Sequence, residues 1–366
     1  MLVATVNSGS TSVKLSAFEG EAPCIRLRLR ERHSVAASLA GETLRGFLGR
    51  LAAMPEAIAH RVVHGGARLV RPVEVSPQVE QTLRELGALA PLHNPVALQW
   101  IGAARRVCAP EVRQIAVFDT AFFAGMPRVA REYALPAEAG AAVGVRRYGF
   151  HGLAHQALWR RWCALQPDRG GRGRVISLQL GGGCSITAIE DGRPLDTSMG
   201  FSPLEGLVMA TRAGDTDAAI VPYLARRLGC APEAIIERLN ERSGLLGVSG
   251  RSGDLRELLA DDSEGARFAV ELYCYRARKY VGAYFAVLGG CDAVLFGGGV
   301  GEHAPEIRAR ILEPLRFLGI ELDAEANAAA RGQESRISSP TSRVAVQVIP
   351  VDEEHALALA ALEYAP

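Results

Sequence analysis

A strand–turn–strand pattern that occurs twice constrains the fold of this chain more than any other feature. The N-terminus has the β-prone run LVATV, the turn-forming stretch NSGSTS and the alternating run VKLSAF. Residues 175–192 repeat this arrangement as VISLQL, GGG and CSITAIEDG. When the two copies are overlaid, Gly9 meets Gly182, Ser12 meets Ser185, and Val13 meets Ile186. We therefore predict two halves that were built on one plan by duplication.

The segments between and after these hairpins predict helices that alternate with strands. A helix is expected from Pro77 in SPQVEQTLRELGAL, and a long one in GARFAVELYCYRARKYVGAYFAVLGG, which ends at a Gly-Gly pair. CDAVLFGGGVGEHAPEIRARIL predicts a buried strand, a glycine loop and then a helix near Pro305, and polar connections are expected at 166–174 and 332–343. A chain of 366 residues exceeds one compact core. The fold class is therefore α/β with two domains.

Composition excludes several classes of protein. The net charge of +1 argues against a protein that mainly binds nucleic acid. The seven cysteines occur singly, without a CxxC pair, which disfavours a disulfide scaffold and a structural zinc site. The sequence shows neither a signal peptide nor an apolar run long enough to cross a membrane. We predict a cytoplasmic location with no membrane or nucleic-acid partner.

Three glycine-containing turns, NSGSTS, LGGGCS and FGGGVGE, indicate a site for phosphate. Glycine lets backbone N–H groups approach an anion closely, and two of the turns lie at the tips of the matched hairpins. No GxxxxGK[ST] occurs, and no GxGxxG follows the first strand, so neither a Walker loop nor a dinucleotide-binding fold is expected. Three such turns together favour a nucleotide-binding site.

Arginines and histidines stand beside these turns. AHRVVHGG places Arg61 in a strand that ends at a Gly-Gly turn, and MATRAGDTD places Arg212 in a loop. Guanidinium groups suit the equatorial oxygens of a phosphoryl group in transfer. GFHGLAH contains His151 and His155, one helical turn apart, but no HExxH occurs and Gly152 is a poor residue within a helix. A metal hydrolase is therefore disfavoured, and His155 is expected to pack or cap the helix that follows.

Taken together, these motifs resemble the acetate/propionate kinase family. NSGSTSVKL, HRVVHGG, APLHNP, VFDTAF, RRYGFHGLAH, DTSMGFSPLEGLVMATRAGD, SGLLGVSG and VIPVDEEHALA occur in the family's order, from Val3 to about Leu362. The resemblance implies two duplicated ribonuclease-H-like domains of the actin/Hsp70 type with an interdomain active-site cleft. It implies a first domain at 1–119, completed by about 354–366, and a nucleotide-binding domain at 120–353. It also implies a homodimer formed through the C-terminal domain.

The implied activity is reversible, Mg²⁺-dependent (or Mn²⁺-dependent) transfer of the γ-phosphoryl group of ATP to acetate, giving acetyl phosphate and ADP. Residues that match the family's catalytic positions are Arg61, Asp119, His151, Arg212 and His93. The acid would be bound by Arg61 and by an apolar pocket of Val63, Leu92, Phe150 and Pro203. Metal positions are Asn7 and Glu353. Because the acid is already ionised at neutral pH, positioning and positive charge should supply most of the catalysis.

The resemblance also implies a set of nucleotide-binding positions. They are Ser10, Ser12, Lys14, Gln179, Gly181, Gly182, Gly183, Asp254, Leu255, Arg256, Gly299, Val300 and Gly301. A glycine at 299 leaves the adenosine pocket open, which favours ATP over pyrophosphate as the donor. The chain departs from the family at four positions, with Gln179 and Phe123 for histidine, Gly182 for asparagine, and His303 for asparagine.

Two alternatives to an acetate kinase stay open at this point. A propionate or other short-chain acyl kinase differs by a methylene in an apolar pocket, which is worth only about 1–3 kcal/mol. A noncatalytic nucleotide-binding scaffold is the second alternative. The presence of both Arg61 and Arg212 favours an enzyme over the scaffold.

Overall fold

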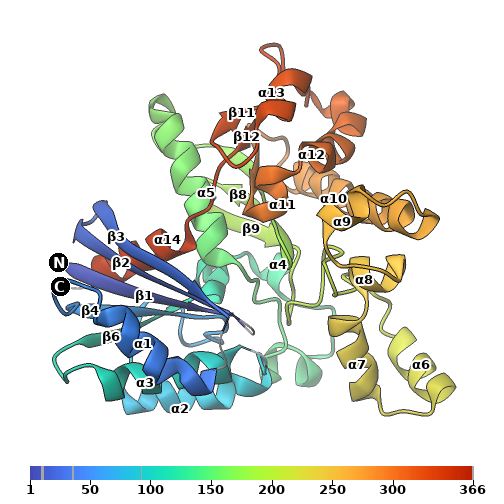
Figure 1. Cartoon of the computed structure of the whole chain (residues 1–366). Helices are drawn as coiled ribbons and strands as arrows, with labels where there is room; N and C mark the ends of the chain where they lie inside the picture. The colour runs from blue at the N-terminus through green and yellow to red at the C-terminus, as the bar shows by residue number, and fades with distance from the viewer. Residues whose placement is uncertain (10–11, 35–36, 92, 365–366) are drawn as a thin grey trace. The chain divides into compact units, whose positions relative to one another are not determined.

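The computed structural model describes residues 1–9, 12–34, 37–91 and 93–364 (Figure 1). The chain forms two compact units. Unit 1 contains residues 1–124, 150–157 and 352–366, and unit 2 contains residues 125–149 and 158–351. Unit 1 thus includes the short segment 150–157, which carries His151, between two stretches of unit 2. Each unit is described by itself below.

Unit 1 is built on a mixed sheet that has, in its described residues, the strand order β3-β2-β1-β4-β6-β5. Its strands are β1 (Leu2–Ser8), β2 (Val13–Glu21), β3 (Cys24–His33), β4 (Ala57–Val62), β5 (Val73–Glu74) and β6 (Arg113–Phe118). β1, β4 and β6 run parallel, whereas β2, β3 and β5 pair antiparallel with their neighbours. The predicted hairpin LVATV–VKLSAF is confirmed as β1 and β2.

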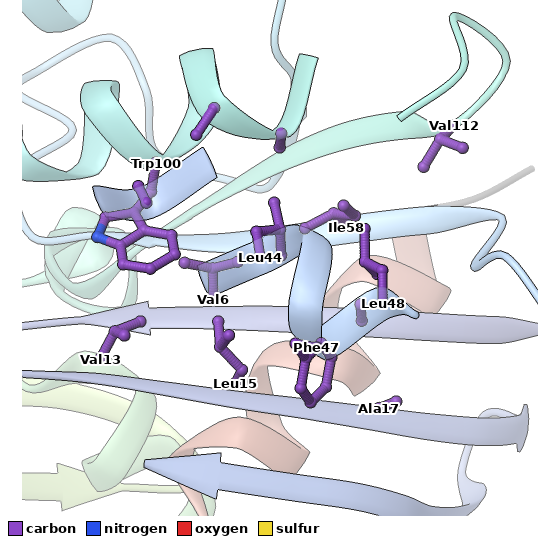
Figure 2. Close-up of a cluster of buried hydrophobic side chains, with 14 residues drawn as sticks. Val6, Val13, Leu15, Ala17, Leu44, Phe47, Leu48, Ile58, Trp100 and Val112 are labelled. Carbon is purple, nitrogen blue, oxygen red and sulfur yellow. The ribbon is translucent and has the colours of Figure 1, made fainter. Parts of the chain in front are cut away.

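Helices cover both faces of this sheet. They are α1 (Ala40–Leu48), α2 (Pro77–Glu85), α3 (Asn94–Val107), α14 (Glu353–Tyr364) and the first turns of α5 (Gly152–Leu165). On one face, Phe47 and Leu44 of α1 and Trp100 of α3 pack on Val6 and Leu15 (Figure 2). The opposite face is covered by α14, which contacts β1, β2 and β4. Burial of such apolar side chains on two faces supplies the main driving force for folding the unit.

The alternation of side chains along these strands decides which polar residues meet. In β1, Val6 belongs to the core under α1 and α3, so Asn7 points to the face covered by α14. In β4, Ala59 packs on the α14 face and Arg61, two residues further on, follows it there. Asp119 directly follows β6, in which Val117 also faces α14. Three polar residues from separate strands therefore lie on the same face as the N-terminus of α14.

Unit 2 repeats the sheet of unit 1 in topology. Its strands are β7 (Arg174–Leu180), β8 (Cys184–Glu190), β9 (Arg193–Thr197), β10 (Ala293–Gly297), β11 (Ser335–Arg336) and β12 (Ala345–Val348). Read from the other edge, their order is β9-β8-β7-β10-β12-β11, which matches β3-β2-β1-β4-β6-β5 strand for strand and in every parallel or antiparallel pairing. The predicted α/β fold with a duplicated plan is confirmed.

The residue-by-residue overlay of the two hairpins needs a correction. The first tip separates the paired ends Ser8 and Val13, and the second separates Leu180 and Cys184, so the second turn is one residue shorter. Alignment of the first strands by their ends places Asn7 opposite Gln179. A constant offset cannot align both strands, because the turns differ in length.

The remaining helices belong to unit 2, apart from the shared helix α5. They are α4 (Arg128–Arg131), α6 (Ile220–Leu228), α7 (Pro232–Glu241), α8 (Gly244–Ser249), α9 (Leu255–Leu259), α10 (Glu264–Val287), α11 (Gly298–His303), α12 (Pro305–Leu312) and α13 (Ala324–Ala329). Short 3-10 turns occur at Ala37–Leu39, Leu86–Ala88, Asp119–Gly125, Ala137–Ala139, Ala141–Val143, Pro167–Arg169 and Glu313–Leu318.

Three helix predictions are confirmed and one loop prediction is wrong. α12 begins at Pro305, as predicted. α2 begins at Pro77, with the hydroxyl of Ser76 accepting the Val79 N–H, and the long helix is α10. The expected glycine loop after β10 is instead the helix α11. Gly298 has φ +77°, which turns the chain directly after the strand, and its N–H donates to the carboxylate of Glu302, four residues further along the same helix. The connection expected at 332–343 also contains β11.

Candidate active site

Arg61 is the centre of a polar cluster in unit 1. At the end of β4, its Nη2 and Nε donate to Asp119 Oδ2 at 2.6 and 3.0 Å. Its Nη1 donates to Asn7 Oδ1 at 3.1 Å and lies 3.7 Å from Glu353 Oε2. The guanidinium is half-buried, and carboxylates from two elements neutralise its charge.

Asn7 joins this cluster to the N-terminus of α14. Its Nδ2 donates to Glu353 Oε2 at 2.9 Å and to Glu354 Oε1 at 2.6 Å. Glu354, which is buried, also pairs with Lys14 of β2, with Nζ 3.4 Å from Oε1. The two acids at the start of α14 lie where the helix dipole favours negative charge. Asn7 and Glu353, which were predicted together, are therefore in contact, and Glu354 is an addition that the motif comparison did not single out.

Burial and charge act against each other on the ionisable groups of this cluster. Burial disfavours the charged form of Arg61, but the carboxylates of Asp119 and Glu353 outweigh burial and raise its pKa above the ordinary value. Burial raises the pKa of Asp119, while Arg61 and the Leu153 N–H pull it down. For Glu353 burial is again the largest effect, yet Arg61 and Asn7, with smaller contributions from other groups, lower its pKa to about 2. Arg61 and Glu353 are both charged at neutral pH.

His151 has an unusual backbone conformation at the entry to α5. Its φ is +59°, a region that non-glycine residues rarely occupy and that concentrates at functional sites. Gly152 follows, and a Cβ there would lie 2.0 Å from the Asp119 carbonyl oxygen, so only glycine fits. His155 is buried on α5 with its ring centroid 6.1 Å from that of Phe123, which confirms its packing role. Because Gly152 packs directly on the Asp119 carbonyl, the preceding residue, His151, lies near Asp119 in unit 1.

The apolar acid-binding positions divide between the units. In unit 1, Val63 and Phe150 are buried, and the ring of Phe150 meets His64 edge-on with centroids 5.7 Å apart. His93 precedes α3, and the neighbouring Asn94 side chain binds both backbone groups of His64, at 3.1 and 2.9 Å. Leu92 lies outside the described residues, and Pro203 belongs to unit 2. The structure thus fixes the backbone beside Val63 through Asn94.

A cavity of about 600 Å³ in unit 2 has the size of a nucleotide site. Seven predicted nucleotide-binding residues line it, namely Gly181, Gly182, Asp254, Leu255, Arg256, Gly299 and Val300. A Cβ at Gly182 or Gly299 would meet no atom within 4 Å, so both glycines leave the space open. Gln179, Gly183 and Gly301 do not line the cavity. Gln179 Oε1 is buried and makes no hydrogen bond within the described residues.

The other six residues of the cavity wall were not predicted as binding residues; they are Leu245, Gly253, Leu259, His303, Ala304 and Arg331. A Cβ at Gly332 would lie 2.2 Å from the His303 ring, so the imidazole packs directly on the backbone there. Arg331 follows α13, far from any glycine motif, and only the tertiary fold brings it to the wall. His303 could have been found from the sequence, because it stands where the family has an asparagine.

The first hairpin tip is placed in unit 1. Ser10 lies outside the described residues. The carbonyl of Ser12 accepts the Gly9 N–H at 2.8 Å and closes the turn, and Lys14 is the residue that pairs with Glu354. The nucleotide-binding roles of Ser10, Ser12 and Lys14 stay predictions.

Arg212 in unit 2 has a very different environment from Arg61. Its Nη1 donates to the carbonyl of Pro203 at 3.3 Å and lies 3.8 Å from Met209 Sδ. No carboxylate of the described residues lies within ion-pair distance of it, and burial lowers its pKa below the ordinary value. The adjacent backbone contacts the cavity loop, since Ala210 N–H donates to the Gly182 carbonyl at 3.1 Å. A half-buried cation without a counter-charge, next to a glycine loop, is suited to bind an anionic phosphoryl group.

The unit 1 cluster offers oxygen donors of the kind that Mg²⁺ prefers. Asp119 Oδ1 is buried and meets no hydrogen-bond donor in good geometry among the described residues, and Glu353 is ionised. Asn7 Oδ1 is engaged by Arg61. The described residues form no ready-made cage of three or more His, Cys, Asp or Glu ligands. Mg²⁺ usually takes only one or two protein carboxylates and keeps waters and phosphate oxygens, so the donor set fits that ion.

The helices in the described part of the chain include none with the length and apolar character to span a bilayer.

Two related α/β units, and a cavity of nucleotide size lined by glycine turns of one unit, are the architecture expected of a phosphotransferase with the predicted nucleotide site. The model of the Acetokinase family matches residues 30–359. The chain is 46% identical over 302 residues to an acetate kinase of Solibacter usitatus, covering 81% of this chain and 73% of that protein. An acetate kinase of Symbiobacterium thermophilum is 47% identical over 301 residues, which are 81% of this chain and 75% of that protein.

Solved structures agree with these relatives over almost the whole chain. The crystal structure of an acetate kinase from Porphyromonas gingivalis has a TM-score of 0.86 at 37% identity and covers 98% of each chain. A propionate kinase from Francisella tularensis has a TM-score of 0.88 at 34% identity, also over 98% of each chain. The chain therefore belongs to the acetokinase family, and it is a kinase whose acceptor is a carboxyl group.

Proposed function

We propose that this chain transfers the γ-phosphoryl group of ATP to acetate, giving acetyl phosphate and ADP in one reversible step. Its similarity to proteins named acetate kinase supports the substrate. The observation that carries the proposal is Arg212, a half-buried cation with no carboxylate partner among the described residues, beside a nucleotide-sized cavity of the same unit. A cation that the fold leaves uncompensated is stabilised when an anionic group binds.

In this step a carboxylate oxygen of acetate attacks the γ-phosphorus while the bond to the bridging oxygen breaks, and ADP leaves with the electron pair. Acetate is ionised at neutral pH and needs no general base. Arg212 would hold the equatorial oxygens of the phosphoryl group, and His151 would donate a hydrogen bond to it. His93, which precedes α3, is proposed as a further active-site residue.

Arg61 would bind the carboxylate of the acid. Its raised pKa keeps it protonated, and its bonds to Asp119 fix the plane of the guanidinium. Buried Val63 and Phe150 of unit 1 would face the methyl group, and Leu92 and Pro203 are proposed as further acid-binding residues. An apolar pocket beside a fixed cation suits a short carboxylic acid.

The nucleotide would occupy the cavity of unit 2. Gly182 would bind a phosphate oxygen through its backbone N–H, while the N–H of Gly181 donates to the Gly183 carbonyl at 3.1 Å and closes the turn, and the open space at Gly299 would admit the nucleoside. Asp254 accepts the Arg256 N–H at the start of α9 and pairs with its side chain, so both are held at the cavity wall. The same roles are proposed for Ser10, Ser12, Lys14, Gln179, Gly183, Leu255, Val300 and Gly301.

Asn7, Glu353 and Asp119 would hold Mg²⁺, directly or through water. When bound, the ion supplies charge neutralisation for the phosphate oxygens. The residues of the chain itself bind and orient the two substrates.

The test of this function is a hydroxamate assay of purified protein with Mg²⁺, using acetate, propionate or butyrate as acceptor and ATP or pyrophosphate as donor. We expect acyl hydroxamate with ATP and acetate, and little with pyrophosphate. ADP release in the absence of acid is the control for simple hydrolysis. If no acid is phosphorylated, the kinase proposal fails and a nucleotide-binding scaffold takes its place.

Propionate is the second candidate acceptor, because the chain is also 34% identical to a propionate kinase over nearly its whole length. One methylene changes the preference by only about 1–3 kcal/mol. The same assay ranks the two acids by kcat/KM.

A homodimer through unit 2 is part of the proposal. Phe268 and Tyr275 of α10 are seven residues apart on one helix face and are 54% and 55% exposed. Exposed aromatic side chains at this spacing suit a helix that packs on a second copy.

A further inference from the structure

The turn at residues 200–205 holds the group that Arg212 contacts. The carbonyl of Pro203 accepts Nη1 of Arg212, and the only other described contact of this guanidinium is the weak one to Met209 Sδ. Arg212 therefore has no charged side chain to hold it, and its position depends on where the chain places Pro203.

A single tyrosine hydroxyl binds this turn on both sides of Pro203. Tyr133 Oη accepts the Phe201 N–H at 2.9 Å and donates to the carboxylate of Glu205. Phe201 lies two residues before Pro203 and Glu205 lies two residues after it. One oxygen atom thus closes the turn across Pro203.

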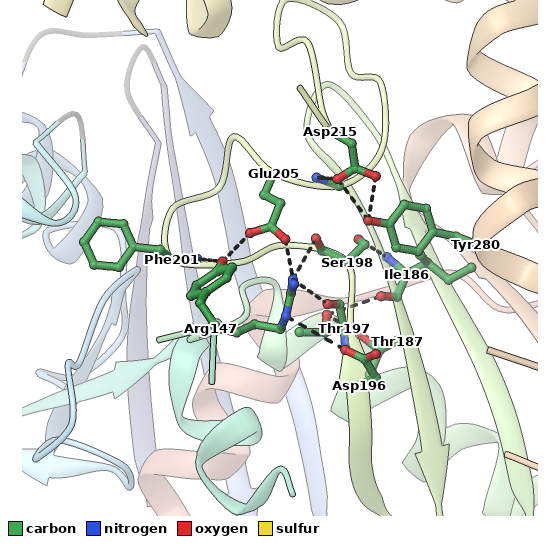
Figure 3. A network of polar contacts seen from close by, with 12 residues as sticks. Arg147, Ile186, Thr187, Asp196, Thr197, Ser198, Phe201, Glu205, Asp215 and Tyr280 are labelled. Atoms are coloured by element: carbon green, nitrogen blue, oxygen red, sulfur yellow. Dashed lines mark hydrogen bonds and ion pairs between the residues drawn. The ribbon is translucent and has the colours of Figure 1, made fainter. Parts of the chain in front are cut away.

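Arg147 fixes the far end of this closure. Its Nη2 donates to Glu205 Oε1 at 2.6 Å, and its Nη1 donates to the carbonyls of Thr197 and Ser198 at 3.0 and 3.2 Å (Figure 3). Its guanidinium carbon also lies 5.6 Å from the centre of the Tyr133 ring. An arginine that binds a carboxylate with one terminal nitrogen and backbone carbonyls with the other is fixed in its orientation, in addition to the energy that the bonds supply.

The backbone at Gly200 is adapted to this closure. A Cβ there would lie 1.6 Å from Glu205 Oε2 and 2.1 Å from Tyr133 Oη. The Gly200 carbonyl accepts the Tyr148 N–H at 3.0 Å, so the backbone cannot move away to make room. Only glycine at this position lets the hydroxyl and the carboxylate meet.

The other end of the Arg212 loop is anchored separately. Asp215 accepts the Gly206 N–H at 3.0 Å and the hydroxyl of Tyr280 at 2.9 Å (Figure 3). With that end fixed, the position of Pro203 depends on the closure made by Tyr133.

We propose that Tyr133 is a positioning residue for phosphoryl transfer, which acts with Glu205 and Arg147 to place the Pro203 carbonyl and, through it, the guanidinium of Arg212. This inference rests on the proposed function and adds Tyr133, which lies outside the motifs that carry the family resemblance. Tyr133 touches neither the cavity wall nor Arg212 itself.

The test is a double-mutant cycle between Tyr133→Phe and Arg212→Lys, with kcat, the KM for ATP and the Kd for ADP as readouts. Tyr133→Phe should lower kcat about tenfold and leave the Kd for ADP unchanged, because the cavity wall is intact. In the Arg212→Lys background the same change should lower kcat less than twofold, since the group it positions is already altered. Glu205→Gln, which keeps the shape of the side chain, should behave like Tyr133→Phe and serves if that variant does not fold.

Tyr148→Phe is the matched control, because it removes a second tyrosine hydroxyl of the same unit, one that donates to the Gly144 carbonyl. It should leave kcat unchanged even if it lowers the unfolding midpoint as much as Tyr133→Phe does. A wild-type kcat in both Tyr133→Phe and Glu205→Gln, or an equal loss of kcat in both Arg212 backgrounds, would overturn the inference. An inactive wild-type protein would instead count against the proposed function.

Discussion

Arg61 and Arg212 are both half-buried arginines in the motifs that resemble a kinase site, yet the protein surrounds them in opposite ways. Arg61 is bonded to Asp119 and Asn7 and lies beside Glu353, and these neighbours raise its pKa. Arg212 meets a carbonyl and a thioether, and burial lowers its pKa. The fold of unit 1 compensates its arginine, whereas unit 2 leaves its arginine without a counter-charge.

This difference indicates two kinds of work. An arginine with its own carboxylates is held rigidly and can orient a substrate at little cost in stability. An arginine without them destabilises the empty protein and gains most when a negative charge arrives, which is the property that catalysis requires. The first two predictions below separate the two residues, and the third concerns His60, which precedes Arg61 on the same strand.

The largest expected effect is that of Arg212→Ala on turnover. Loss of a cation that stabilises the transferring phosphoryl group should lower kcat roughly 10³-fold. The unfolding midpoint should stay the same or rise, because an uncompensated buried charge is removed. Steady-state kinetics and thermal unfolding measure both quantities. Arg227→Ala, at an exposed position of α6, is the control that should change neither.

Arg61→Met, unlike Arg212→Ala, should cause a large loss of stability. It leaves Asp119 buried beside Glu353 without the cation that both face, and breaking such a buried pair costs about 3–5 kcal/mol. Denaturant unfolding measures the free energy. The double variant Arg61→Met, Asp119→Asn should regain part of the loss, and Arg212→Met should cost far less. Equal stabilities of the two single variants would break the comparison.

The smallest effect concerns His60, which precedes Arg61 on β4 and is buried. Burial, and to a smaller degree Arg105, lowers its pKa from 6.5 to about 4, while the bond to Gln114 opposes the shift. The unfolded chain takes up this proton below pH 6.5 and the folded chain does not, so stability is lost as the pH falls from 6.5 to about 4, by up to about 3 kcal/mol. His60→Gln should flatten the curve of unfolding free energy over that range. An unchanged curve would show that protonation of His60 does not cause the loss of stability over that range.

The sequence predicts most of the secondary structure around these arginines, because the apolar residues of the strands and helices follow the regular spacing of each element. The hairpins, α2 and α10 follow from alternation and from caps such as Ser76. The place of glycines within a motif turn, such as Gly181 and Gly182, could also be predicted from the sequence, and both line the cavity.

Contacts between distant residues could not be derived from local pattern. Glu354 lies 347 positions from the Asn7 that it binds, and Tyr133 lies 72 from Glu205. Burial decides such contacts, since a polar group that leaves water needs a partner from wherever the fold supplies one. The helix α11 was missed for a related reason: the Glu302 carboxylate binds the N–H of Gly298 in the first turn, which offsets part of the poor helix propensity of the glycines.

The most direct test of the account is the binding of acetyl phosphate alone, measured by isothermal titration calorimetry at low salt, to the wild-type protein and to Arg212→Gln. If Arg212 is compensated only by the phosphoryl group, the variant should bind at least about tenfold more weakly, which is about 1.4 kcal/mol, with an unchanged unfolding midpoint. Equal affinities in the two proteins would contradict the claim that this arginine is held ready for the transferred group.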